Sequence, residues 1–391
     1  MAALRKFQTS PDRPRYHRGM QQTIETLRAR VHAAAAAGEV LRLVGSGSKD
    51  FLGQPLQGTA LSTAGLQGVV AYEPTELVIT VGAATPWREV VGLVAQQRQC
   101  MAFDPPVTGP DMTVGGVIAA GLSGPARASV GGVRDFILGA QMINGRGELL
   151  NFGGQVMKNV AGYDLSRVLA GSMGTLGIIT QASIKVLPQA LAEATLCFLG
   201  SQEHALAQLM RWRAQPLPID ASCWVLNAAG DGVLALRLRG AAVAIEAARE
   251  SMLAQAGSGH LAFDEPGTMD WDALRDQRHA FFTQAPSEDA CLWRLGVPAA
   301  TPAMPLGLPR MMEWHGAQRW FWGSAHEAHG LRDWAKRVGG HATLYRVSAA
   351  HGEADKAVGV YSPLSPVLQT VNTRLQAQFD PQGVFRTQRL G

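Results

Sequence analysis

Glycine is concentrated in one part of the chain, and there it alternates with apolar residues. The chain has 44 glycines among 391 residues, against an average usage near about 7%, and the excess lies between Gly109 and Gly177. A flexible linker this rich in glycine would be polar, whereas these glycines are interleaved with Val, Ile, Leu and Met. The segment therefore indicates a folded domain in which backbone atoms, rather than side chains, approach a ligand.

Length and composition indicate a globular protein with more than one domain. A single core usually stops growing near about 250 to 300 residues, so 391 residues leave room for two domains and a short appendage. Hydrophobic residues make up 47% and charged residues 17%, which excludes disorder, and no apolar run reaches the roughly 20 residues of a membrane span. The formal net charge of +4 is too small and too dispersed to indicate nucleic-acid binding.

The cysteines and the N-terminal segment give no sign of a metal centre or of export. The four cysteines lie far apart without a C-x-x-C pair, so a zinc ribbon or an iron–sulfur cluster lacks its usual ligands, and we expect no metal. Residues 1–20 form a basic arm that lacks the apolar segment of about 7 to 15 residues found in secretory signals. We therefore expect a cytoplasmic protein.

Hydrophobic periodicity predicts alternating helices and strands in the first half of the chain. Apolar residues at helical spacing predict a helix over 21–37 that ends at Gly38, and Pro86 suits the first turn of a second helix. The predicted strands are 40–44, 68–72, 77–81 and 178–187. A Glu-Pro-Thr-Glu connection makes the second and third of them a hairpin, and Pro188 ends the fourth.

The second half predicts a separate and smaller domain. Helical patterns at 203–213 and 243–256 enclose two strand patterns at 221–226 and 233–238, which is typical of a ferredoxin-like unit. A last helix is predicted over 363–379, and no sequence repeat is visible. The predicted fold class is α+β, with a basic arm at 1–20, a glycine-rich domain at 21–188, a cap at 189–345, and a C-terminal segment at 346–391 that returns to the glycine-rich domain.

Two glycine clusters suit a diphosphate, whose charge can be met by main-chain N–H groups in concave turns. The first is Gly45-Ser46-Gly47-Ser48, directly after a predicted strand, and the second is Thr113-Val114-Gly115-Gly116. A dinucleotide fingerprint fails because Asp50 stands where its third glycine belongs, and no P-loop occurs. The run 121–124 is one residue short of a nucleophile elbow, so a serine hydrolase is not favoured.

Two further motifs follow the two glycine clusters along the chain. They are Met157-Lys158-Asn159-Val160-Ala161-Gly162-Tyr163-Asp164-Leu165 and the run 171–180, and together with the clusters they form four ordered motifs. In that order they resemble the FAD-binding domain of the vanillyl-alcohol oxidase (PCMH) type. Segments 133–136, 144–148 and 152–157 are similar to the FAD-binding E subunits of bacterial glycolate oxidases. The likeness covers 40–188 well, the middle of the chain poorly, and 379–385 again. It implies two α+β subdomains that hold FAD, with a cap over the flavin ring.

The resemblance also assigns site residues. It places the pyrophosphate against the residues of both glycine clusters and Lys49, namely Gly45, Ser46, Gly47, Ser48, Lys49, Thr113, Val114, Gly115 and Gly116. It places Ser123, Gly124 and Gly131 along the path of the cofactor. The adenine and ribose end is assigned to Gly174, Gly177, Ile178 and Ile179. A flavin-side role for Lys158, Asn159, Tyr163 and Asp164 is open, since Asp164 can equally cap a helix and Tyr163 can be core.

Departures from the family pattern are informative. Relatives that attach flavin covalently use a His in the first loop or on the cap, whereas this loop offers Ser48 and Lys49, so the resemblance implies non-covalent FAD. Met173 stands where many relatives have Glu. Catalytic relatives carry a run H-x-G-D-G-N-x-H, of which only His351-Gly352-Glu353 has a counterpart here. The pair His326 and His329 is spaced by three, which favours a solvated helix face over a metal site. No catalytic base can be named.

The leading hypothesis is therefore an FAD-binding subunit of a glycolate-oxidising complex. The family arrangement implies two partners: a second flavoprotein subunit that oxidises glycolate, and an iron–sulfur subunit that passes electrons toward quinone at the membrane, where the complex would be peripheral. Two alternatives remain. One is a self-sufficient FAD dehydrogenase for D-lactate or glycolate, and the other is a scaffold subunit that keeps the fold without the chemistry.

Overall fold

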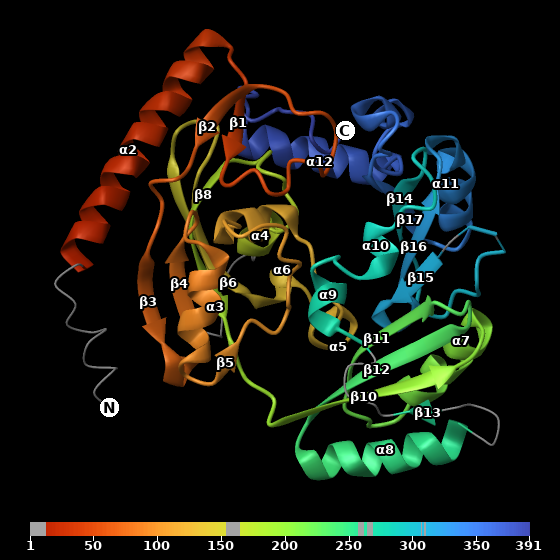
Figure 1. Cartoon of the computed structure of the whole chain (residues 1–391). Coiled ribbons are helices and arrows are strands. Elements are labelled where there is room, and N and C mark those ends of the chain that lie inside the picture. The colour runs from red at the N-terminus through yellow and green to blue at the C-terminus, as the bar shows by residue number, and fades with distance from the viewer. Residues whose placement is uncertain (1–12, 154–164, 257–261, 264–268, 306, 309) are drawn as a thin grey trace.

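The computed structural model describes residues 13–153, 165–256, 262–263, 269–305, 307–308 and 310–391. Figure 1 shows two parts, each built on its own β-sheet, with short helices between them. Strands between residues 69 and 185 form a five-stranded sheet, and strands from 192 onward form an eight-stranded one. We propose to divide the chain accordingly into the glycine-rich domain (21–188), the cap (189–345) and the C-terminal segment (346–391).

The glycine-rich domain begins with a long helix on a two-stranded parallel sheet. Helix α2 (Arg13–Ala37) starts earlier than the predicted residue 21 and ends where Gly38 takes a φ of +66°. Strand β1 (Leu41–Val44) pairs with β2 (Thr59–Ser62). Ile24, Leu27 and Val31 of α2 are buried in one cluster with Leu41, so the predicted apolar face of the helix is confirmed.

The five-stranded sheet is antiparallel throughout, in the order β3-β4-β8-β6-β7. Its strands are β3 (Val69–Glu73), β4 (Val78–Gly82), β8 (Ile178–Lys185), β6 (Ile137–Ile143) and β7 (Leu149–Gly153). The predicted hairpin is confirmed, with a short 3-10 turn at Pro74–Glu76 between β3 and β4.

Helices α3 (Trp87–Ala95), α4 (Val114–Ala120) and α6 (Val133–Phe136) pack their apolar residues on this sheet. Shorter elements of the same region are β5 (Gln99–Cys100), which pairs with β9 (Leu187–Pro188), helix α5 (Arg127–Val130) and the 3-10 helix η2 (Leu165–Leu169).

The cap starts with the predicted ferredoxin-like unit. It runs through β10 (Ala192–Leu199), α7 (Gln202–Arg213), β11 (Ile219–Leu226), β12 (Gly232–Gly240), α8 (Ala242–Ala256) and β13 (Ala262–Phe263). The strands lie in the antiparallel order β13-β10-β12-β11, which is the fourth-first-third-second order of that motif. The helices pack on one face through Leu206, Leu209, Trp212, Ile245 and Met252.

A second unit with the same strand order continues the sheet. Its elements are β14 (Cys291–Gly296), β15 (Arg310–Glu313), β16 (Gln318–Gly323), α11 (Ala328–Arg337) and β17 (His341–Arg346), in the order β15-β16-β14-β17. The two units join where β11 pairs with β15. The confirmed α+β class thus contains a cap of two related units, although the sequence predicted only the first. The described part of the connection 297–309 contains no helix, so the α-β-β-α pattern that revealed the first unit is missing.

Smaller helices fill the space between the domains and at the edge of the cap. They are α9 (Trp271–Arg275), α10 (Ala280–Thr283), η3 (Trp314–Gly316), η4 (Ala325–Glu327) and η5 (Gly352–Val358). Across the portions of the chain described above, no helix is long and apolar enough to cross a bilayer.

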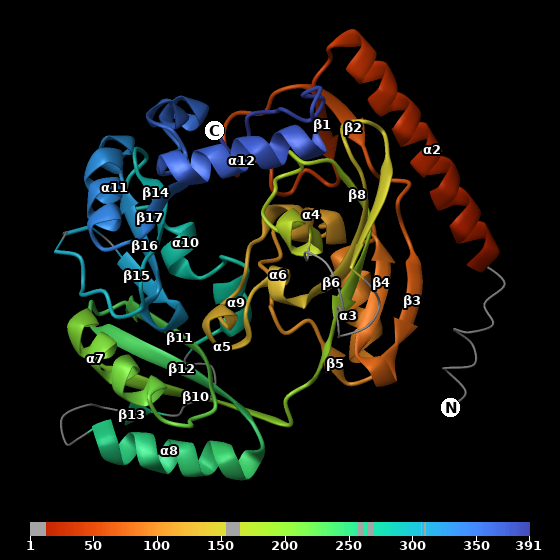
Figure 2. The ribbon, with the colours of Figure 1, turned by 180° about the vertical axis from the view of Figure 1, so that it is seen from behind.

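The C-terminal segment leaves the cap and reaches the glycine-rich domain. Helix α12 (Pro366–Phe379) runs across one end of the molecule in both views (Figures 1 and 2). Beyond it, Val384 and Phe385 are buried against α2 and β1, and the N–H of Leu41 donates to the carbonyl of Val384 at 2.7 Å. The last residues of the sequence are therefore part of the hydrophobic core that α2 and β1 form at the start of the chain.

Candidate functional site

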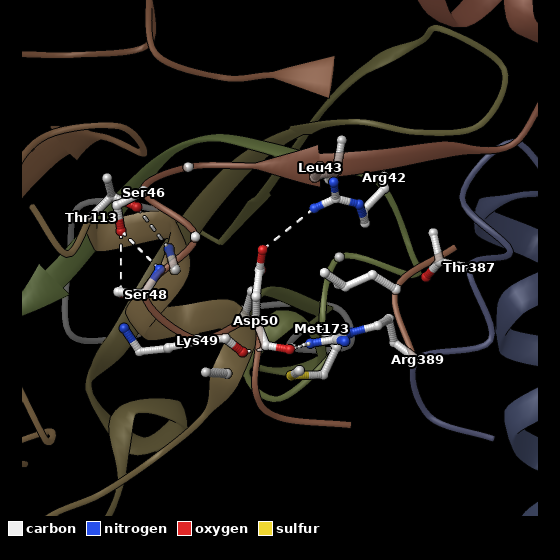
Figure 3. A pocket seen from close by; sticks show the side chains of 17 residues that line it. Arg42, Leu43, Ser46, Ser48, Lys49, Asp50, Thr113, Met173, Thr387 and Arg389 are labelled. Atoms are coloured by element: carbon white, nitrogen blue, oxygen red, sulfur yellow. Dashed lines mark hydrogen bonds and ion pairs between the residues drawn. The ribbon is translucent and has the colours of Figure 1, made fainter. Parts of the chain in front are cut away.

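A groove opens in the glycine-rich domain beside the end of β1 and the start of α4. Its two adjoining sections share seven lining residues, which are Leu43, Gly45, Thr113, Gly116, Ala119, Met173 and Gly174. One section continues along the loop 45–50 to Arg389, and the other continues to the start of β8. Figure 3 shows the first section, with Arg42 on β1 and Arg389 on the C-terminal segment both reaching it.

The loop 45–50 lines this groove and carries main-chain donors that are not used within the described chain. Gly47 has a φ of +73°, and its carbonyl accepts from the N–H of Asp50 at 3.0 Å, which closes a tight turn. Ser48 is anchored at the side, since its hydroxyl accepts from Thr108 Oγ1 at 3.1 Å. Within the described chain, the N–H groups of Gly45, Ser46, Gly47 and Lys49 have no hydrogen-bond acceptor. Such a row of open amides suits an anionic ligand.

The second glycine cluster forms a wall rather than a row of donors. The N–H of Val114 donates to the carbonyl of Thr85, that of Gly115 to the carbonyl of Ala83, and that of Gly116 to Thr113 Oγ1. A Cβ on Gly45 would lie 3.0 Å from Thr113 Oγ1, so the first loop fits closely against this wall. Thr113, Gly115 and Gly116 line the groove, whereas the Val114 side chain is buried in the core.

The section of the groove that continues to the start of β8 contains the residues assigned to the adenine and ribose end. Gly174, Gly177, Ile178 and Ile179 line it together. Gly177 has a φ of +142°, and a Cβ there would lie 2.4 Å from the carbonyl oxygen of Ile143. Only glycine therefore lets the chain enter β8 at this point.

Three predicted residues lie outside the groove, and two of them, Ser123 and Gly124, lie at the interface with the cap. Ser123 Oγ accepts from Arg127 Nη1 at 2.9 Å, and the carbonyl of Gly124 accepts from Trp314 Nε1 at 3.0 Å. Gly131, with a φ of +97°, lies against the side chain of Asp135. The chain turns toward the cap at Gly121, which ends α4 in the left-handed region. Lys158, Asn159, Tyr163 and Asp164 lie outside the described residues.

Arg389 was not predicted, and it holds the glycine loop in place. Its side chain is 4% exposed and donates to the carbonyls of Gln54 at 2.8 Å, Asp50 at 3.2 Å and Lys49 at 3.5 Å. Arg42, also missed, lies 3.5 Å from the carboxylate of Asp50. Nothing in the local sequence marks either arginine, because their role follows from contacts between distant segments.

The electrostatic character of this section is positive. Among the residues that the structure describes, Arg42, Lys49 and Arg389 line it together with one acid, Asp50. Burial lowers the pKa of Lys49 to about 8, because a low-dielectric site disfavours the charged form. Burial also lowers the pKa of Arg389. A negative ligand would offset both effects, so the residues present fit a diphosphate.

The cap meets the glycine loop through aromatic side chains. Phe51, directly after the loop, contacts Tyr345 edge to face at 5.6 Å between ring centroids, and Tyr345 contacts Trp320 at 4.9 Å. Glu313 accepts from Trp320 Nε1, and burial raises its pKa to about 7. His351 is exposed, and its ring lies 3.4 Å from Ser348 Oγ in its own turn and 3.8 Å from Asp289. His329 is exposed and lies 2.9 Å from Asp333.

Comparisons with known proteins show which sequence family and which fold the chain shares. Residues 21–153 match the family described as the FAD binding domain. The chain is 38% identical over 366 residues to the glycolate oxidase subunit GlcE of Escherichia coli, covering 94% of this chain and 97% of that protein. It is also 38% identical to the glycolate oxidase subunit GlcD of Bacillus subtilis, but over 25% of this chain and 20% of the relative.

A D-lactate dehydrogenase of Archaeoglobus fulgidus is 37% identical over 24% of the chain and 21% of its own length. Among solved structures, an alkyldihydroxyacetonephosphate synthase matches with a TM-score of 0.62 and 15% identity, covering 92% of this chain and 73% of that one. At this identity, the structural match shows a shared fold only.

Proposed function

Because the chain belongs to the family of the glycolate oxidase subunit GlcE, we propose that it is the FAD-binding subunit of a complex that oxidises glycolate to glyoxylate. The observation that carries the proposal is the loop 45–49, which lines a positively charged groove and has four main-chain amides without an acceptor among the described residues. A pyrophosphate needs such donors, and glycine leaves them accessible.

In this proposal each part of the groove has a separate task. The amides of 45–49 and the side chains of Arg42 and Lys49 bind the pyrophosphate, with Thr113, Gly115 and Gly116 as the opposite wall. Gly174 and 177–179 receive the adenine and ribose end. Ser123, Gly124 and Gly131 approach the flavin end from the side of the cap. FAD is proposed to be held without a covalent bond, since the first glycine loop offers Ser48 and Lys49 in place of a His.

FAD supplies the acceptor for the hydride that leaves a 2-hydroxyacid. This chain contributes binding and exclusion of water, because the cluster of Phe51, Tyr345 and Trp320 packs over the loop. The carboxylate that the described residues bring into the groove, Asp50, lies 3.5 Å from Arg42 and belongs to the loop assigned to the pyrophosphate, not to the proposed flavin end. The hydroxyl proton is therefore removed elsewhere, and electrons pass through partner subunits.

The proposed partners are a second flavoprotein subunit and an iron–sulfur subunit. The names of the relatives, glycolate oxidase subunits GlcE and GlcD, support a complex with several subunits. The complex would reach a membrane only through its partners, so this subunit should be released from membranes together with them and not alone.

Anaerobic spectroscopy tests the function. The chain purified alone should be yellow and should release free FAD when it is denatured with acid. Glycolate should leave its flavin oxidised in isolation but should bleach it when both partner subunits are added. Bleaching of the isolated chain would instead establish a self-sufficient dehydrogenase, with D-lactate as the second substrate to try. A colourless chain that stays colourless after FAD is added would establish a scaffold.

A further inference from the structure

The first turns of α12 have little support from the rest of the chain. The residues at its start, 366–371, are all exposed, and because a helical turn takes about 3.6 residues they cover the whole circumference of the helix. Among the 14 residues of α12, only Phe379 at its end is buried. Figure 2 shows the helix crossing one end of the molecule from the glycine-rich domain toward the cap. The start of α12 is therefore open to solvent on all sides.

Local capping begins this helix without help from a core. Ser365 Oγ accepts from the N–H of Leu368 at 3.3 Å, and Pro366 takes the first helical position, which suits its fixed φ. At the other end, Leu375 and Phe379 pack on the core of the five-stranded sheet. Short helices are marginal in water and are usually stabilised by packing, so the first turns lack the support that the last turn has.

An apolar stripe runs along this unsupported part. Val367 is 72% exposed, Leu368 56% and Val371 57%. At about 3.6 residues per turn, these three residues and Leu375 lie on one face of the helix. The protein's own core covers this face at Leu375 and leaves it open at the three residues before it. Contiguous exposed apolar surface of this kind marks an interaction site.

The sequence around the stripe is nearly free of charge. Between Lys356 and Asp380 the only charged residue is Arg374, whereas charged residues make up 17% of the whole chain. The other polar residues of α12 are Gln, Thr and Asn. Helices that lie on a membrane carry many Lys and Arg residues on their polar face, whereas depletion of charge is typical of the centre of a protein–protein interface. The composition therefore favours a protein partner over a lipid surface.

The size of α12 argues against a second copy of this chain as that partner. A helix of 14 residues is about 21 Å long and about 10 Å wide, so one face offers about 200 Å² and the whole circumference about 650 Å². Two copies that paired their α12 faces would bury far less than the roughly 800 Å² per partner of a standard interface. A groove that encloses the helix comes much closer to that area.

We propose that α12 docks in an apolar groove of a partner subunit, with Val367, Leu368 and Val371 on the floor of the groove and uncharged side chains along its rim. The inference rests on the proposed function, because the partner is one of the two subunits proposed there, and it adds the surface of this chain that meets the partner. Helix α12 leads through Asp380 to Arg389, so one continuous segment carries both the docking surface and the brace of the glycine loop.

Co-expression of the tagged full chain with both proposed partner subunits tests the surface, and quantitative mass spectrometry measures how much of each partner is retained per tagged chain. Val367→Gln and Val371→Gln together should lower the retention of a partner about tenfold or more, because two apolar side chains are lost from the groove, while Gln favours the helix. The matched control is Leu191→Gln with Val243→Gln. These residues are 89% and 83% exposed elsewhere on the cap, and the control should change retention by less than about twofold.

The proposal is overturned if the α12 variant retains both partners as wild type does, or if the control loses them equally. Self-association of the isolated chain, or its binding to phosphatidylglycerol vesicles, that disappears in the α12 variant would assign the helix to a second copy or to a membrane instead. Retention that falls about tenfold between about 0.1 and about 0.5 M salt would contradict the uncharged rim.

Failure of the docking surface differs from failure of the proposed function. Wild-type protein that retains neither partner would end the proposed function, whereas retention by both wild type and the α12 variant would end only the docking surface. Melting curves and the FAD content of each variant, measured on the same samples, show that the fold is kept.

Discussion

The guanidinium of Arg389 donates a hydrogen bond of 2.8 Å to the carbonyl of Gln54, across 335 residues of sequence. The carbonyl of Arg389 in turn accepts from the N–H of Gln54 at 3.1 Å. These reciprocal bonds hold the end of the glycine loop against the C-terminal segment. A Cβ on the intervening Gly53 would lie 2.6 Å from the carbonyl oxygen of Arg389, so the two segments could not approach with any larger residue there.

Replacing Arg389 with Met should therefore weaken FAD binding. The substitution removes the guanidinium donor from the carbonyls of Asp50 and Gln54 and one of the two donors of the Lys49 carbonyl, and a buried group left without its partner costs about 1–3 kcal/mol. We expect the Kd for FAD, measured by fluorescence quenching, to rise about tenfold or more. The exposed Arg386 supplies the control, since Arg386→Met removes the same charge without these contacts. Equal affinities in the two variants would contradict the role given to Arg389.

Gly47→Ala should also reduce FAD affinity while leaving the fold intact. The φ of +73° at this residue costs an L-residue about 1–2 kcal/mol, and no atom lies within 3.4 Å of the added Cβ. The strain should change the turn that aims the open amides. In Gly92→Ala, on the open side of α3, the same chemical change should stabilise the protein by about 0.5–1 kcal/mol. Thermal melts and FAD titrations separate the two effects.

FAD affinity should fall as the pH rises above about 8, where burial has placed the pKa of Lys49. A bound diphosphate favours the charged amine and raises that pKa, so binding takes up a proton between the free and the bound pKa. Affinity should be constant below that window and should fall by at most about tenfold per pH unit within it. Titrations from pH 7 to 10 in Lys49→Met should lose this dependence, while Lys185→Met should keep it. A slope shared by all three proteins would rule out Lys49 as its source.

His315 should make the domain interface sensitive to acid. Its Nε2 lies 3.0 Å from Ser129 Oγ of α5, its Nδ1 lies 3.0 Å from Ser222 Oγ, and burial lowers its pKa from 6.5 to about 4. Between these values the unfolded chain binds more protons, so stability is complete above about pH 6.5 and is lost as the pH falls toward 4. The loss should total about 3 kcal/mol.

Urea unfolding at several pH values measures this loss. His315→Asn tolerates the φ of +54° at this position and does not titrate, so its stability should depend less on pH in that window. His329→Asn changes a histidine that is 90% exposed and should behave as wild type. An unchanged pH dependence in His315→Asn would assign the acid sensitivity to another group.

Local sequence signals predicted the glycine-rich domain well. The turn residues of the Glu-Pro-Thr-Glu connection and the apolar face of α2 are confirmed because both are decided by residues a few positions apart. The position of the first glycine loop, directly after a strand, was predicted for the same reason. The sequence did not reveal that the amides of Val114 and Gly115 are occupied, since their acceptors, the carbonyls of Thr85 and Ala83, lie about thirty residues earlier in the chain.

Features that depend on distant contacts escaped prediction. Arg389 and Arg42 reach the groove only because the C-terminal segment and β1 meet in the hydrophobic core beside α2. The second unit of the cap was missed since its strand order, and not any similarity of residues, relates it to the first.

The return of the C-terminal segment also sets the order in which the protein can mature during translation. Val384, Phe385 and Arg389 leave the ribosome after both units of the cap, yet they complete the core beneath β1 and brace the glycine loop. A nascent chain that has emerged only as far as residue 188 carries every glycine assigned to the cofactor but lacks the segment that holds the loop in shape. Flavin loading is therefore expected to be a late, post-translational step.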